Sequence, residues 1–138
     1  MSREAVVSEA KKWLGARWQH GVCLPYIATD CGQILMSIYA NIGLIEKTAI
    51  DYYPRDWSLH RSEERYLAVV TRYAHEVTEP NLGDIAVWKV GRTFSHGAIV
   101  VNWPQIIHAD IKEGVVLANV QYGRLAQREV RFFSVFED

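Results

Sequence analysis

The chain has 138 residues, of which 49% are hydrophobic and 22% are charged, and its formal net charge is −1. These values fit one compact globular domain and exclude a disordered chain. Acidic and basic residues are mixed without a basic stripe, so we expect no nucleic-acid partner. No apolar stretch approaches the roughly 18–20 residues of a membrane span, and the polar N-terminus indicates synthesis in the cytoplasm without a signal peptide.

The first part of the chain predicts two helices joined by a loop. Ser2 is a suitable N-cap for the first helix, whose apolar face carries Ala5, Val6, Ala10, Trp13 and Leu14. Residues 18–29 contain Gly21 and Pro25 and lack helical periodicity, so we expect a loop there. The second helix is predicted from about Cys31 to Asn41, and its apolar side indicates a place in the centre of the domain.

Residues 51–79 have a different character. An irregular segment rich in aromatic residues, Tyr52 to Trp57, precedes an amphipathic helix that we predict over about 62–74. This helix interrupts a chain that otherwise places its helices first and its strands afterwards. We interpret residues 51–79 as an insertion or a lid-like element on the rim of the domain.

The last third of the chain predicts a sheet. Runs rich in β-branched and aromatic residues, separated by short turns, predict five strands at about 84–90, 96–102, 105–109, 115–120 and 129–135. Connections this short join antiparallel neighbours rather than parallel ones. The predicted fold class is α+β, a single domain over residues 1–138, with the Cys31 helix packed on an antiparallel sheet of about five strands.

Cys31 stands at the first turn of the second predicted helix. There its sulfur faces unpaired backbone N–H groups and the positive end of the helix dipole, and both favour the thiolate. The alternative is that Cys31 is a small buried residue, which is a common role for cysteine. Cys23, in the preceding loop, does not form a C-x-x-C pair with it, and no H-E-x-x-H helix is present, so we expect neither a metal site nor a cofactor.

Two histidines lie near the ends of predicted neighbouring strands. If the turn at Trp103-Pro104 joins these strands, pairing counted outward from it brings His96 and His108 into the same region. A thiolate nucleophile needs a base and a group that orients the base. Cys31 would then attack, His96 would carry the proton, and His108 would hold the His96 ring in the useful tautomer. The alternative is that each histidine only satisfies the end of a strand.

The order of these motifs resembles the NlpC-type cell-wall cysteine peptidases, which are papain-like endopeptidases of bacterial peptidoglycan. The resemblance covers nearly the whole chain and rests on Trp13-Leu14-Gly15, Pro25-Tyr26, Asp30-Cys31, Gly83-Asp84-Ile85-Ala86, the run from Ser95 to Val100, and Ile107-His108-Ala109. Two further stretches, Tyr52 to Tyr66 and Gly123 to Phe133, are similar to the phage and prophage branch, whose members are encoded among tail genes. The resemblance implies a papain-like fold.

The resemblance also implies roles for individual residues. Cys31 matches the nucleophile, His96 the base and His108 the orienting residue. Asp30 matches an acid that helps bind the free amine of a stem-peptide L-alanine, although a carboxylate at this position can equally act as a helix cap. Tyr26 matches a tyrosine that lines the cleft, with core packing as the alternative.

The chain departs from the family pattern beside the nucleophile. Asp-Cys-Gly-Gln replaces the common Asp-Cys-Ser-Gly, so Gln33 places a longer side chain near the thiolate, where it could bind substrate or crowd the site. Trp57, in the aromatic segment, could line the cleft as well, with ordinary core packing as the alternative.

The implied activity is hydrolysis of the bond between γ-D-glutamate and a diamino acid in a peptidoglycan stem peptide, during phage tail-mediated penetration of the cell wall. The expected location is the virion tail, with action at the periplasmic cell wall and a tail-tip protein as a possible partner. Two alternatives stay open. One is a tail-assembly or structural protein of the same fold without turnover, and the other is a related thiol amidase or acyltransferase.

Overall fold

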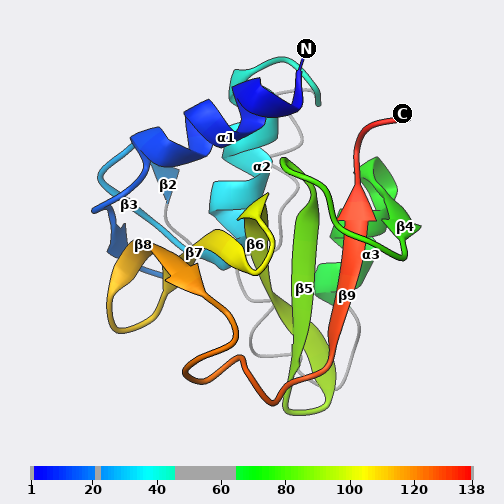
Figure 1. Cartoon of the computed structure of the whole chain (residues 1–138). Coiled ribbons are helices and arrows are strands. Elements are labelled where there is room, and N and C mark those ends of the chain that lie inside the picture. Colours follow the sequence, from blue (N-terminus) through cyan, green and yellow to red (C-terminus); the bar gives the residue numbers. More distant parts are fainter. Residues whose placement is uncertain (1, 21–22, 46–64, 138) are drawn as a thin grey trace.

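The computed structural model describes residues 2–20, 23–45 and 65–137 (Figure 1). Helices α1 (Arg3–Lys12), α2 (Cys31–Asn41) and α3 (Arg65–Tyr73) all contact strand β6 (Thr93–Asn102) of a six-stranded antiparallel sheet. This arrangement confirms the predicted α+β class. It also confirms the expected contact between the Cys31 helix and the sheet.

The first two helices begin where their capping residues predict. The Ala5 N–H donates to Ser2 Oγ at 3.1 Å, which caps α1. At the start of α2, the N–H groups of Gly32 and Gln33 donate to Asp30 Oδ1 at 3.1 and 2.8 Å. The predicted range of the second helix is confirmed at both ends.

The segment between α1 and α2, predicted as a loop, contains a small sheet instead. Strands β1 (Arg17–Trp18), β2 (Cys23–Leu24) and β3 (Ala28–Thr29) pair in the order β1-β3-β2. The N–H of Arg17 donates to the Ile27 carbonyl at 2.8 Å, and that of Gln19 to the Thr29 carbonyl at 2.9 Å. The loop prediction was wrong because two-residue strands are too short to show an alternating pattern.

The main sheet has the order β4-β9-β5-β6-β7-β8. Its strands β5, β6, β7, β8 and β9 correspond to the five predicted ones, and they span Ile85–Val90, Thr93–Asn102, Gln105–Asp110, Gly114–Asn119 and Val130–Ser134. The sixth strand, β4 (His75–Val77), pairs with β9 at the edge of the sheet, which is visible beside the red β9 arrow in Figure 1. The insertion predicted at about residues 51–79 includes these three residues, which pair with the main sheet.

Helix α3 is part of the core rather than a lid on the rim. Its residues Tyr66, Leu67 and Val70 are buried in the same cluster as Leu35 of α2 and Ile99 of β6. The helix predicted over 62–74 is confirmed where the structure describes it. Residues 46–64, and with them Trp57 and most of the proposed insertion, lie outside the described residues.

Apolar side chains fill both faces of the sheet. Alternate residues of β6 separate cleanly, because Ile99 packs toward the helices whereas Ala98 and Val100 join a second cluster on the other face. That second cluster contains Trp88, whose ring lies 6.2 Å from the ring of Trp103. The central strands β5, β6 and β7 therefore carry buried apolar side chains on both faces of the sheet.

Candidate active site

The pairing of β6 with β7 brings the two candidate histidines together. Ile99 pairs with Ile107 and Val100 with Ile106. In this register His108 is diagonal to His96 on the same face of the sheet. His96 Nε2 lies 2.8 Å from His108 Nδ1, and the two rings are nearly perpendicular, at 86°. The predicted juxtaposition of His96 and His108 is thus present in the structure.

Strand β6 is irregular at this point. Trp88 of β5 pairs with His96, but the next residue, Lys89, pairs with Phe94, so Ser95 is one extra residue on β6. An extra residue of this kind is a β-bulge, which bends the strand and redirects its side chains. The bulge therefore exposes the backbone around His96 to helix α2.

Cys31 approaches the bulge from the helix side. It is the first residue of α2, after the Asp30 cap, and it is 4% exposed. Its Sγ lies 3.6 Å from the carbonyl oxygen of Ser95, the residue before His96. In this structure the thiol therefore contacts the backbone beside the base rather than the imidazole itself.

The ionisation of Cys31 differs from our expectation. Burial raises the pKa of the Cys31 thiol and the negative charge of Asp30 raises it further, while hydrogen bonds from the Gly97 backbone and the Tyr66 hydroxyl lower it to a smaller extent. Burial likewise lowers the pKa of His96 to about 3, with His108 adding to the effect. The prediction of a preformed thiolate was wrong for this state, because desolvation exceeds the favourable effect of the helix start.

Tyr66 of α3 is a site residue that sequence reasoning missed. Its hydroxyl donates to the Cys31 carbonyl oxygen at 2.9 Å. A Cβ at Gly97 would collide with that hydroxyl and would come within 2.9 Å of Leu35 Cδ1. Gly97 is therefore required so that a tyrosine from another element can reach the nucleophile. A signal was present in Gly97, because a glycine inside a strand often marks a site where another group approaches closely.

Asp30 and Gln33 frame the start of α2. The Asp30 side chain is fully buried, its Oδ1 caps the helix, and its Oδ2 lies 3.8 Å from His20 Nδ1. Gln33 is 4% exposed, and its Oε1 has no hydrogen-bond partner among the described residues. The structure thus gives Asp30 its capping role, and it leaves Gln33 with a buried acceptor near the nucleophile.

Tyr26 lies away from Cys31. Its hydroxyl donates to Glu9 Oε2 at 2.9 Å, and the same oxygen accepts from Asn41 Nδ2 at 3.0 Å. Asn41 ends the 11-residue helix that Cys31 begins, so the two positions are about 15 Å apart along its axis. The structure does not bring the Tyr26 hydroxyl to the nucleophile, because that hydroxyl joins α1 to the far end of α2.

The described residues contain no group of three or more His, Cys, Asp or Glu side chains arranged to hold a metal ion. Within the same residues, no helix combines the length and apolarity required to cross a membrane.

No protein-family model matches the chain, and no curated protein matches its sequence. Solved structures do share its fold. One is the NlpC/p60 domain of the peptidoglycan hydrolase SagA, with 20% identity and a TM-score of 0.67 over 95% of this chain and 97% of that chain. Another is NlpC1 from Trichomonas vaginalis, with 18% identity and a TM-score of 0.67 over 95% of this chain and 42% of that one. At these identities the similarity establishes the fold, which is the papain-like NlpC/p60 fold.

Proposed function

We propose that the protein is a cysteine peptidase that hydrolyses the bond between γ-D-glutamate and a diamino acid in peptidoglycan stem peptides. One observation carries the proposal. Cys31 begins a helix that is packed against the strand bearing His96, and the His96 ring is held by His108 at 2.8 Å. The chain has the fold of the NlpC/p60 domain of a peptidoglycan hydrolase, which supports the same substrate class.

The contact between the histidines assigns their nitrogens. Because His96 Nε2 faces His108 Nδ1, the nitrogen of His96 that is left for the thiol is Nδ1. His96 can accept a proton at Nδ1 only if its Nε2 carries the hydrogen and donates it to His108. His108 therefore fixes both the tautomer and the orientation of the base.

In the proposed reaction the Cys31 thiol gives its proton to His96 Nδ1 as the sulfur attacks the carbonyl carbon of the substrate. The carbon–nitrogen bond then breaks, and the leaving amine takes the proton from His96, which leaves a thioester on Cys31. Water attacks the thioester, His96 accepts a proton from that water, and the departing sulfur recovers it. The backbone N–H of Cys31, at the start of α2, is a donor for the oxyanion.

Digestion of purified sacculi tests the proposal. The wild-type protein and a Cys23→Ser control are expected to release fragments cut between γ-D-glutamate and the diamino acid, as identified by mass spectrometry. Cys31→Ala is expected to release none, because it lacks the nucleophile while its fold is retained. Absence of this cleavage with the wild-type protein would contradict the proposed activity and favour a structural protein or a thiol amidase with another substrate.

We also propose that the protein acts from a phage tail on the periplasmic cell wall, with a tail-tip protein as its partner. The support is the similarity of residues 52–66 and 123–133 to the phage and prophage branch of these peptidases. Mass spectrometry of purified virions is expected to detect the protein in the tail fraction. Its absence from virions would contradict this location without affecting the proposed chemistry.

A further inference from the structure

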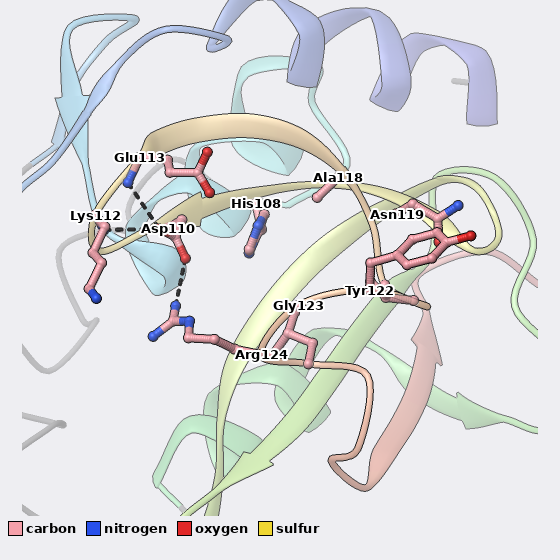
Figure 2. Close-up of a pocket in the computed structure, with 11 residues that line it drawn as sticks. His108, Asp110, Lys112, Glu113, Ala118, Asn119, Tyr122, Gly123 and Arg124 are labelled. Carbon is pink, nitrogen blue, oxygen red and sulfur yellow. Dashed lines mark hydrogen bonds and ion pairs between the residues drawn. The ribbon is translucent and has the colours of Figure 1, made fainter.

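A pocket of about 320 Å³ opens directly beside the histidine pair (Figure 2). His108 forms part of its wall, and in Figure 2 it lies between Lys112 and Asp110 on one side and Tyr122 and Asn119 on the other. Four charged residues also line it, namely Asp110, Lys112, Glu113 and Arg124. The chemistry proposed above uses only His108 among these residues, so the function of the pocket is not explained by that chemistry.

Asp110 is a buried anchor at this pocket. It is 7% exposed, and its Oδ2 accepts hydrogen bonds from the backbone N–H groups of Lys112 and Glu113, both at 2.9 Å. Its Oδ1 accepts from Arg124 Nη2 at 2.5 Å. Burial acts to raise the pKa of Asp110, but these donors outweigh it and hold the pKa below its usual value. Asp110 is therefore a charged, fully engaged carboxylate that fixes Arg124.

Arg124 itself remains accessible. Its side chain is 56% exposed, whereas that of Asp110 is 9% exposed. A guanidinium has five N–H donors, and the ion pair with Asp110 engages Nη2 alone. Figure 2 shows Arg124 reaching toward Asp110 on the His108 side of the pocket. A guanidinium held at one corner in this way is preorganised to bind a carboxylate with its other donors.

The position of the histidines indicates which part of a substrate would reach this pocket. In the proposed reaction His96 gives a proton to the leaving amine, so the leaving group must lie against His96. His108, whose ring contacts that of His96, lines the pocket. A residue attached to the leaving amine would therefore extend over the histidine pair into the pocket.

We propose that this pocket is a subsite for the leaving-group residue of the substrate and that Arg124 binds a carboxylate of that residue. The inference rests on the proposed peptidase function. Lys112 adds a second positive charge to the lining, and Glu113 suits an amino group on the same residue. Asp110 is a positioning residue that acts through Arg124.

Binding to the inactive Cys31→Ala protein tests the subsite without turnover. The probes are L-alanyl-γ-D-glutamyl-meso-diaminopimelate and the same tripeptide with both diaminopimelate carboxylates converted to amides. By calorimetry, the acid is expected to bind roughly tenfold to hundredfold more tightly than the amide, which is the effect of one hydrogen bond to a charged group. Equal affinity for the two probes would overturn the proposal.

Substitutions then test whether Arg124 causes the preference for the acid over the amide. In the Cys31→Ala background, Arg124→Gln is expected to weaken binding of the acid to the level of the amide, and Arg124→Lys is expected to retain part of the preference. Arg92→Gln removes the same charge at the exposed β5–β6 turn and is expected to leave both affinities unchanged. Equal weakening of both probes by Arg124→Gln, or an unchanged preference, would also overturn the proposal.

The same probes separate this inference from the proposed function. If wild type cleaves neither tripeptide but Cys31→Ala still prefers the acid through Arg124, the carboxylate site stands and the peptidase activity fails. If wild type cleaves both tripeptides with equal KM, the activity stands and the subsite fails.

Discussion

The sulfur of Cys31 is surrounded by protein groups from two other elements. The Ser95 carbonyl and the Gly97 N–H belong to β6, and the Tyr66 hydroxyl belongs to α3. In this environment the neutral thiol is favoured, and His96 is neutral as well, because burial lowers its pKa to about 3. Because both groups are neutral, the Cys31 thiol gives its proton to His96 only as the sulfur attacks the substrate. We therefore expect the activity to depend on how the substrate fills the space near Cys31.

Alkylation of Cys31 by iodoacetamide tests this resting state. In a Cys23→Ser background, Cys31 is expected to react more slowly at pH 7 than an ordinary thiol, whose pKa is about 8.5. Because burial raises the pKa of Cys31, the rate should still rise above pH 9. Tyr66→Phe is expected to raise the pH at which the alkylation rate increases, because the Tyr66 hydroxyl lowers the pKa of Cys31. A rate that is already maximal below pH 7 would show a preformed thiolate and contradict this description.

Single residues were predictable where local spacing determines their position. The contact between His96 and His108 follows from counting along two strands on either side of one turn. Tyr66 was not predictable, because its contact with Cys31 joins two helices through a gap at Gly97 that only the packed structure defines. The same reason explains why Tyr26, close to Cys31 in sequence, has its hydroxyl at the other end of α2.

At the scale of elements, the site depends on how closely α3 approaches β6. The bulge at Ser95 bends the strand, and Gly97 leaves room for the Tyr66 ring between α2 and the sheet. Tyr66 is 3% exposed, so it is packed as a core residue while its hydroxyl holds the first residue of α2. The position of the nucleophile is therefore determined by three elements together.

Gly97→Ala is expected to lower the free energy of unfolding by about 1–3 kcal/mol, because the added methyl group collides with the Tyr66 hydroxyl. Urea denaturation measures the change. Tyr66→Phe removes the colliding oxygen. The loss of unfolding free energy caused by Tyr66→Phe should therefore be smaller in the Gly97→Ala background than in the wild-type background. Strictly additive effects of the two substitutions would show that the Tyr66 hydroxyl and residue 97 are not in contact.

Helices and strands with a clear periodic pattern of apolar residues were predictable from the sequence, and very short strands were not. Helix α2 and the five longer strands carry several turns or alternations of apolar residues. Strand β4 spans three residues and depends on its partner β9, to which the exposed Arg131–Glu76 ion pair also joins it. Its pairing is tertiary information, which no local pattern contains.

Across the whole molecule, a buried ion pair joins the first helix to the sheet. Arg3 Nη1 lies 2.6 Å from Asp84 Oδ1, and the two side chains are 12% and 2% exposed. The same nitrogen donates to the Leu82 carbonyl at 2.9 Å, and Asp84 Oδ2 accepts from the Asn81 N–H at 2.8 Å. This group of bonds connects residues about 80 positions apart, just before β5 begins.

Asp84→Asn is expected to lower the free energy of unfolding by about 3 kcal/mol, because it removes the negative charge of a buried ion pair with Arg3. Glu76→Gln is the matched control, since it breaks an ion pair whose side chains are 37% and 49% exposed. Its expected cost is about 1 kcal/mol or less. Urea denaturation of both variants measures the difference, and similar losses would show that the Arg3–Asp84 pair is not especially important for stability.

The overall architecture was predictable because the order of patterns along the chain limits it. Helical periods come first and closely spaced strands follow, which leaves an antiparallel sheet covered by helices. The charged pocket beside His108 was not predictable, because Arg124 reaches Asp110 from residues 120–129, which follow β8 and contain no helix or strand.

The contact of Cys31 with the β6 backbone, beside His96 and His108, also has a consequence during synthesis. Cys31 and His108 are separated by 77 residues of chain. At ~5–20 residues per second, the ribosome needs roughly 4–15 seconds to add them. Throughout that interval the nascent chain carries the nucleophile without its complete base. If the protein is the proposed peptidase, the cell that makes it is therefore not exposed to a competent enzyme until the sheet has left the ribosome.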